Sequence, residues 1–87
     1  VWGINVCDDE QYFLDKVRAD VAHWQATFPD TPPVVVEPRV LDGYVGQGYA
    51  RAGPEIFTLI EELAALEGVV LDPVYTAKAF HGLLCEI

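Results

Sequence analysis

Two tyrosines occupy places in the chain from which a phenol hydroxyl could do chemistry. Tyr75 follows Asp72-Pro73-Val74, which is typical of a helix start, so we expect it in the first turn of the last helix. Unpaired backbone N–H groups there favour an anion, which predicts a lowered pKa of the Tyr75 phenol, useful in proton transfer or nucleophilic attack. Packing of Tyr75 on the preceding loop explains its position equally well. Tyr49 lies in a glycine-rich loop, where a tyrosine by default packs with its hydroxyl in water.

Other candidate residues have simpler explanations. Gly46-Gln47-Gly48 looks like the start of a dinucleotide-binding turn, but Arg51 stands where that fingerprint needs a third glycine. Lys78 could form a Schiff base if it were buried, but we expect this lysine near a helix start to be solvated. Cys7 and Cys85 have no metal or disulfide spacing, and we expect two buried thiols. No metal site is readable.

Composition narrows the possible classes of protein. The chain has 87 residues, 52% of them hydrophobic, which fits at most one small globular domain. Its net charge of −9 disfavours a nucleic-acid partner, and its apolar runs are too short to span a membrane. With no recognisable signal peptide, a cytoplasmic location is expected. The chain lacks methionine, begins in an apolar run and ends in mid-helix, so we expect it to be part of a longer protein, incomplete at both ends.

The pattern of apolar residues predicts an α/β fold with a partial parallel sheet. Residues 1–6 read as a buried strand, and Asp8, with Gln11 as its capping-box partner, begins a helix that reaches residue 27. An apolar stripe runs along this helix. Residues 34–40 form a second strand, for which Pro38 indicates an edge position or an early end. Strand, helix and strand together predict a βαβ unit with parallel pairing.

The second half of the chain predicts two helices. Residues 41–53 form the glycine-rich loop, after which Pro54 opens a helix that ends at Gly68. The buried face of this helix is expected to contain Ile56, Leu59, Ile60, Leu63 and Leu66. Residues 69–71 are a short buried strand or a connector. Asp72 then caps the last helix.

These residues resemble the C-terminal part of a known enzyme family. Gly48-Tyr49 in a glycine-rich loop, a helix ending Leu66-Glu67-Gly68 and the run from Leu71 to Ala79 look like D-cysteine desulfhydrases and 1-aminocyclopropane-1-carboxylate (ACC) deaminases. The resemblance covers residues 1–87. It implies part of the large domain of a pyridoxal-phosphate (PLP) enzyme of fold type II, the tryptophan-synthase-β-like fold.

The resemblance also implies roles for three residues. Tyr49 and Tyr75 would be catalytic residues beside the substrate, and Thr76 would lie next to the pyridine ring of the cofactor. ACC deaminases typically carry Glu at the Thr76 position, where it can hold a proton on the ring nitrogen, whereas desulfhydrase-like members carry Thr or Ser. Because a hydroxyl stabilises that positive charge much less, Thr76 points to the desulfhydrase branch. After Tyr49 many members have Gly and a Pro-Asn stretch; residues 50–53 depart from this, which leaves substrate choice open.

The resemblance implies a function for the full-length protein. The family's Schiff-base lysine and phosphate-binding loop have no counterpart here. A complete homodimeric enzyme would remove the Cα proton of a small D-amino acid and eliminate its β-substituent, releasing pyruvate, ammonia and sulfide. The isolated chain would be inactive. An ACC deaminase remains the nearest alternative, and a non-catalytic α/β interaction module, its old active-site face covered by a partner, is the other.

Overall fold

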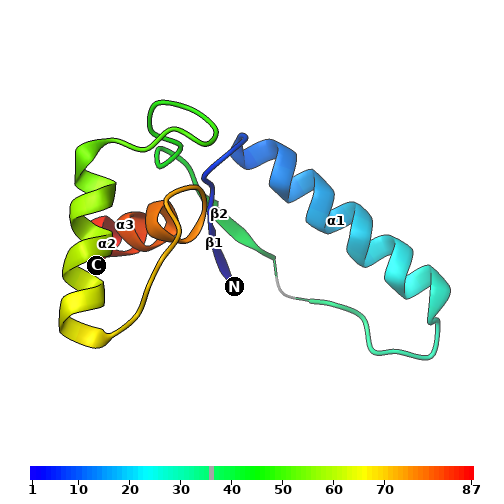
Figure 1. Cartoon of the computed structure of the whole chain (residues 1–87). Coiled ribbons are helices and arrows are strands. Elements are labelled where there is room, and N and C mark those ends of the chain that lie inside the picture. The colour runs from blue at the N-terminus through cyan, green and yellow to red at the C-terminus, as the bar shows by residue number, and fades with distance from the viewer. Residues whose placement is uncertain (36) are drawn as a thin grey trace.

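The computed structural model describes residues 1–35 and 37–87. In these ranges the element order is β1 (Trp2–Ile4), α1 (Glu10–Thr27), β2 (Arg39–Leu41), α2 (Pro54–Glu67) and α3 (Thr76–Glu86). β1 and β2 pair in parallel, with Trp2 opposite Arg39 and Ile4 opposite Leu41. The predicted α/β class and parallel βαβ unit are confirmed. Figure 1 shows α1 extending to one side of this small sheet and α2 with α3 on the other.

Both strands are shorter than the sequence predicted. Ladder pairing in β2 starts at Arg39, whose N–H donates to the carbonyl of Val1 at 2.9 Å. Pro38 explains the late start because proline has no N–H to donate. Val36, part of the predicted strand, lies outside the described residues. Of the two alternatives for residues 69–71, a short buried strand or a connector, the structure shows the connector, in which Val70 is 81% exposed. Apolar residues alone do not make a strand where no neighbouring backbone pairs with them.

Helix α1 begins one residue later than predicted. Its N-cap is Asp9 rather than Asp8, and the Asp9 carboxylate accepts from the N–H of Tyr12 at 2.7 Å. The helix ends at Thr27 as predicted. None of its residues is buried. In the described ranges α1 packs against β2, and Val17 and Val21 of its apolar stripe line an open groove. Within the described residues, no helix combines the length and apolar character needed to cross a bilayer.

Helices α2 and α3 pack against each other, and α3 also packs on β1. Pro54 opens α2, and Gly68 ends it with a left-handed φ of 67°, both as predicted. Ile56 is buried as predicted. Leu66 was also predicted to be buried, but it is 80% exposed. Gly82 lets α3 pack closely against Ile4 of β1 and against Tyr44, because a Cβ at this position would fall 2.8 Å from Ile4 Cγ2 and 3.0 Å from the ring of Tyr44.

Candidate active site

The turn that precedes α3 is organised by one carboxylate. Asp72 Oδ1 accepts from the N–H groups of Val74 and Tyr75 at 2.9 and 2.7 Å. Its Oδ2 accepts from the N–H and the hydroxyl of Thr76 at 3.1 and 2.6 Å. These donors, the Thr76 hydroxyl foremost, hold the pKa of Asp72 well below its ordinary value. The predicted helix start is too early: residues 73–75 form a turn, regular α3 begins at Thr76, and its N-cap is Tyr75 and not Asp72. The Asp72 carboxylate nevertheless binds the N–H groups of Tyr75 and Thr76 at this end.

That turn brings Tyr75 onto Tyr49. The two hydroxyl oxygens lie 2.6 Å apart, which is a hydrogen bond in which either can be the donor. The rings are tilted by 59°, with centroids 6.1 Å apart. Tyr49 comes from the glycine-rich loop and Tyr75 from the turn before α3, 26 residues later. Both side chains are accessible, at 60% and 48% exposure. The structure therefore presents a paired hydroxyl group to solvent.

The predicted lowering of the Tyr75 pKa is wrong. The hydrogen bond with Tyr49 is the main cause that raises the pKa of Tyr75, and desolvation and the neighbouring charges of Cys7 and Asp72 act in the same direction. The backbone N–H groups expected to favour an anion are already bound to the Asp72 carboxylate. Tyr75 is accordingly suited to donate a hydrogen bond or a proton at neutral pH, and not to act as a nucleophile.

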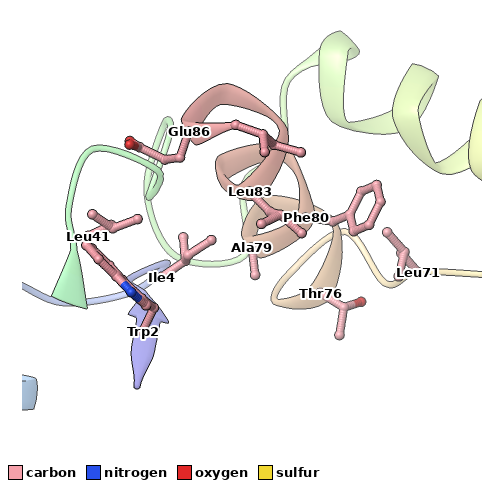
Figure 2. Close-up of a pocket in the computed structure, with 10 residues that line it drawn as sticks. Trp2, Ile4, Leu41, Leu71, Thr76, Ala79, Phe80, Leu83 and Glu86 are labelled. Atoms are coloured by element: carbon pink, nitrogen blue, oxygen red, sulfur yellow. The ribbon is translucent and has the colours of Figure 1, made fainter. Parts of the chain in front are cut away.

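Thr76 lies next to this pair in the sequence but faces elsewhere. Its hydroxyl donates to Asp72 Oδ2 and accepts from the Asp72 N–H at 2.8 Å. Thr76 also lines a mostly apolar groove of about 670 Å³ between the sheet and α3, which neither Tyr49 nor Tyr75 lines. Figure 2 shows Trp2, Ile4 and Leu41 on one side of this groove and α3 residues on the other. The structure thus joins two of the three predicted site residues and sets Thr76 on an adjoining surface.

Lys78 departs most from its sequence prediction. It is only 1% exposed, although it is the third residue of α3 and was expected at the surface. Its Nζ donates to the carbonyls of Val45 and Gly48 at 2.7 and 2.9 Å. Both carbonyls belong to the glycine-rich loop. Sequence reasoning missed this contact, although a signal was present: Ala77 and Ala79 flank the lysine, and no acidic residue stands three or four positions away to pair with it on a helix surface.

The start of the loop is tied to the carboxyl ends of both strands. Asn5, which is 3% exposed, donates from Nδ2 to Asp42 Oδ1 at 2.6 Å and accepts at Oδ1 from the N–H of Asp8 at 3.0 Å. The second oxygen of Asp42 accepts from the N–H of Glu10 at 3.0 Å, at the start of α1. These polar groups are satisfied by one another. They therefore position the loop and helix and offer no free ligand group.

The predicted burial of the two cysteines is wrong. Cys7 and Cys85 are free thiols, as expected without a pairing motif, but both are exposed. Cys7 lies in the turn between β1 and α1, and Cys85 lies in the last turn of α3. The part of the chain that the structure describes leaves both of these turns uncovered.

Comparison with known proteins reveals several relatives. No protein-family model matches the chain. A Thermotoga maritima protein provisionally named 1-aminocyclopropane-1-carboxylate deaminase is 39% identical over 97% of this chain. The Arabidopsis thaliana bifunctional D-cysteine desulfhydrase/1-aminocyclopropane-1-carboxylate deaminase, a mitochondrial protein, is 34% identical over the whole chain. A D-cysteine desulfhydrase of Klebsiella pneumoniae is 46% identical over 43 residues.

These relatives are considerably longer than this chain. The matched segment spans 27% of the Thermotoga protein, 20% of the Arabidopsis protein and 13% of the Klebsiella protein. The similarity to the first two nevertheless extends over nearly all of residues 1–87, through both helices that border the tyrosine pair. The chain is therefore homologous to a segment of proteins named D-cysteine desulfhydrase and 1-aminocyclopropane-1-carboxylate deaminase.

Proposed function

We propose that this chain forms part of a PLP-dependent enzyme that eliminates sulfide from D-cysteine. The observation that carries the proposal is the pair of accessible hydroxyls of Tyr49 and Tyr75, 2.6 Å apart. They lie at the two positions at which the family resemblance puts substrate-facing tyrosines. Similarity to proteins named D-cysteine desulfhydrase supports the choice of substrate class.

Thr76 would hold the PLP cofactor at the nitrogen edge of its ring. Its hydroxyl gives its proton to Asp72 and accepts from the Asp72 N–H, which leaves one lone pair as an acceptor, and it lines a groove whose apolar walls include Leu71 and Phe80. The buried amine of Lys78 is already bound to two carbonyls, so this lysine is not a candidate for the Schiff base. The Schiff-base amine and the phosphate donors would come from the rest of the protein. When bound, PLP supplies an electron sink for the charge left at Cα after proton loss.

The tyrosine pair would act at the leaving group. Elimination breaks the Cα–H and Cβ–S bonds of D-cysteine, and the departing sulfur takes up a proton. The resulting enamine reacts with water to give pyruvate and ammonia. Tyr75, whose pKa is raised chiefly by its bond to Tyr49, keeps its proton at neutral pH and can donate it to the sulfur. Within the pair one O–H is donated to the other oxygen, which leaves the second O–H free for the substrate.

ACC deamination is a second candidate, since the Thermotoga and Arabidopsis relatives carry that name. Opening the cyclopropane ring requires stronger electron withdrawal than expelling a thiolate. Thr76 offers a hydroxyl where a carboxylate would hold a proton on the ring nitrogen. This difference favours D-cysteine over ACC as the substrate.

Pyruvate release by the full-length protein tests the proposal. The protein is supplied with PLP and then with D-cysteine, L-cysteine or ACC, and pyruvate and sulfide are measured together. We expect pyruvate and sulfide in equal amounts from D-cysteine and much slower release from the other two compounds. Faster pyruvate release from ACC would favour the second candidate. Absence of pyruvate from all three would reject both.

A further inference from the structure

One of the contacts that hold the glycine-rich loop, which carries Tyr49, to α3 is made by a buried cation. Lys78 reaches from the third position of α3 to the carbonyls of Val45 and Gly48. These carbonyls lie on either side of Gly46-Gln47, so one ammonium closes this turn from within. In the described ranges no carboxylate lies within ion-pair distance of the Lys78 amine. The loop backbone is thus its acceptor.

A buried ammonium group needs hydrogen-bond acceptors around it. Removing the charge from water is costly unless its N–H groups find acceptors, so the two carbonyls must point inward for α3 to pack as it does. The loop turns its carbonyls inward with the help of left-handed φ values of 70° at Gly46 and 128° at Gly48, which glycine adopts without strain. The carbonyl of Gly48 also accepts from the N–H of Arg51 at 3.1 Å, which closes the next turn.

This arrangement acts directly on Tyr49. The second carbonyl bound by Lys78 belongs to Gly48, the residue immediately before the tyrosine. Tyr75 stands one helical turn before Lys78, so the same stretch of chain supplies the partner hydroxyl and the cation that fixes the loop. Residues 75–78 therefore set both members of the hydroxyl pair relative to one another.

We propose that Lys78 is a positioning residue that fixes the glycine-rich loop and thereby aligns Tyr49 with Tyr75 for reaction. The inference rests on the proposed function for its catalytic consequence, while the effect on the loop stands on the contacts alone. Lys78 does not touch the substrate in this account. Its loss should displace Tyr49 and leave the cofactor in place.

The test uses Lys78→Met in the full-length protein, because methionine keeps the approximate bulk of the side chain and loses both donors. Lys16→Met is the matched control, since Lys16 is an exposed lysine that pairs with Asp20 on α1. Amide hydrogen exchange of residues 45–49 is measured first. We expect exchange roughly tenfold faster in Lys78→Met than in Lys16→Met. Unchanged exchange would overturn the inference whether or not the protein is an enzyme. If Lys78→Met does not fold, Lys78→Gln, which keeps a neutral donor, is measured in the same way.

A double-mutant cycle with Tyr49→Phe tests the catalytic consequence. We expect each single change to lower kcat for D-cysteine by roughly 10- to 100-fold, with the visible absorbance of bound PLP unchanged. Because both changes disable the same hydroxyl, the double variant should be no slower than the slower single variant. Losses that multiply would overturn the alignment role of Lys78. Full activity in Tyr49→Phe would instead count against the proposed function. The hydrogen-exchange result would then decide by itself whether Lys78 fixes the loop.

Discussion

The hydroxyls of Tyr49 and Tyr75 behave as one unit at the scale of single residues. Their 2.6 Å bond commits one of two protons, and the pKa of Tyr75 is raised, so the pair offers one hydrogen-bond donor to a ligand at neutral pH. A lone phenol at a helix start would have been biased toward the anion. The pairing, which depends on a loop 26 residues away, reverses that bias.

Asp72 gives a pH-dependent prediction at the same scale. Its folded pKa lies below the ordinary value of 3.8 because the hydroxyl of Thr76 and three N–H groups stabilise the carboxylate. A lowered folded pKa contributes stability that is present above about pH 4 and is lost as the pH falls further. We expect Asp72→Asn to unfold at lower urea concentration than the parent at about pH 7, with a smaller difference at about pH 3.

The control for this measurement is Asp30→Asn, in an exposed loop. It should leave the urea midpoint nearly unchanged at both pH values. An Asp72→Asn difference that is as large in acid as at neutral pH would show that the Asp72 charge is not what stabilises the turn.

Sequence reasoning at the residue scale succeeded where the signal was local. Asp72-Pro73 correctly indicated that a helix follows, because the Asp72 carboxylate binds N–H groups within four residues, although the N-cap itself is Tyr75. It failed for Lys78 and for the Tyr75 pKa, since both depend on contacts with the loop about 30 residues away. A lysine at a helix start and a tyrosine near a dipole have ordinary solvated explanations. The contacts with the loop that show otherwise become visible only in the folded structure.

At the scale of elements, the packing of α3 depends on Gly82. A Cβ there would fall 2.8 Å from Ile4 Cγ2 and 3.0 Å from the ring of Tyr44, whose hydroxyl donates to Glu86 at 2.5 Å. That bond raises the pKa of Tyr44 to about 12. Gly82→Ala gains about 1 kcal/mol of helix propensity but incurs about 1–3 kcal/mol from overpacking. We therefore expect a net loss of up to about 2 kcal/mol in the free energy of unfolding.

Gly3→Ala is the matched control for this change. A Cβ at Gly3 would meet its nearest neighbours at 3.9–4.0 Å, which is ordinary contact, so the denaturation midpoint should barely move. Equal midpoints for Gly82→Ala and the parent would show that α3 can shift away from β1 without cost.

The helices were easier to predict than the strands. Pro54 and Gly68 set the ends of α2 through backbone geometry that each residue carries with it, and both ends were predicted correctly. The strands depend on partners elsewhere in the chain. The β1–β2 pairing supplies a partner for residues 39–41, but residues 69–71 have the composition of a strand without a backbone to pair with in the described part of the chain.

At the scale of the whole molecule, the chain leaves much apolar surface open. It is 52% hydrophobic, yet the buried apolar side chains among the described residues are those of Ile56 and Ala77. Large apolar residues are exposed, among them Trp2 at 61% and Ile87 at 89%, and both line the groove beside α3. Surfaces of this kind are normally covered. This agrees with a chain that spans about a quarter of the length of its Thermotoga relative.

The isolated 87-residue chain should therefore not act as a PLP enzyme. Mixed with an equimolar amount of PLP, it should show no visible Schiff-base absorbance, because the buried amine of Lys78 is committed to two carbonyls. A stoichiometric band that disappears in Lys78→Met, but persists in Lys16→Met, would contradict this account and identify Lys78 as the reactive lysine.

The most direct test of the central claim is the turnover of D-cysteine by the full-length protein with Tyr75→Phe. Tyr12→Phe, on an exposed tyrosine of α1, serves as the control. Loss of the Tyr75 hydroxyl should lower kcat for pyruvate release roughly 100-fold, with the absorbance of bound PLP unchanged and Tyr12→Phe fully active. Turnover by Tyr75→Phe equal to that of the parent would contradict a role for the hydroxyl pair in the reaction.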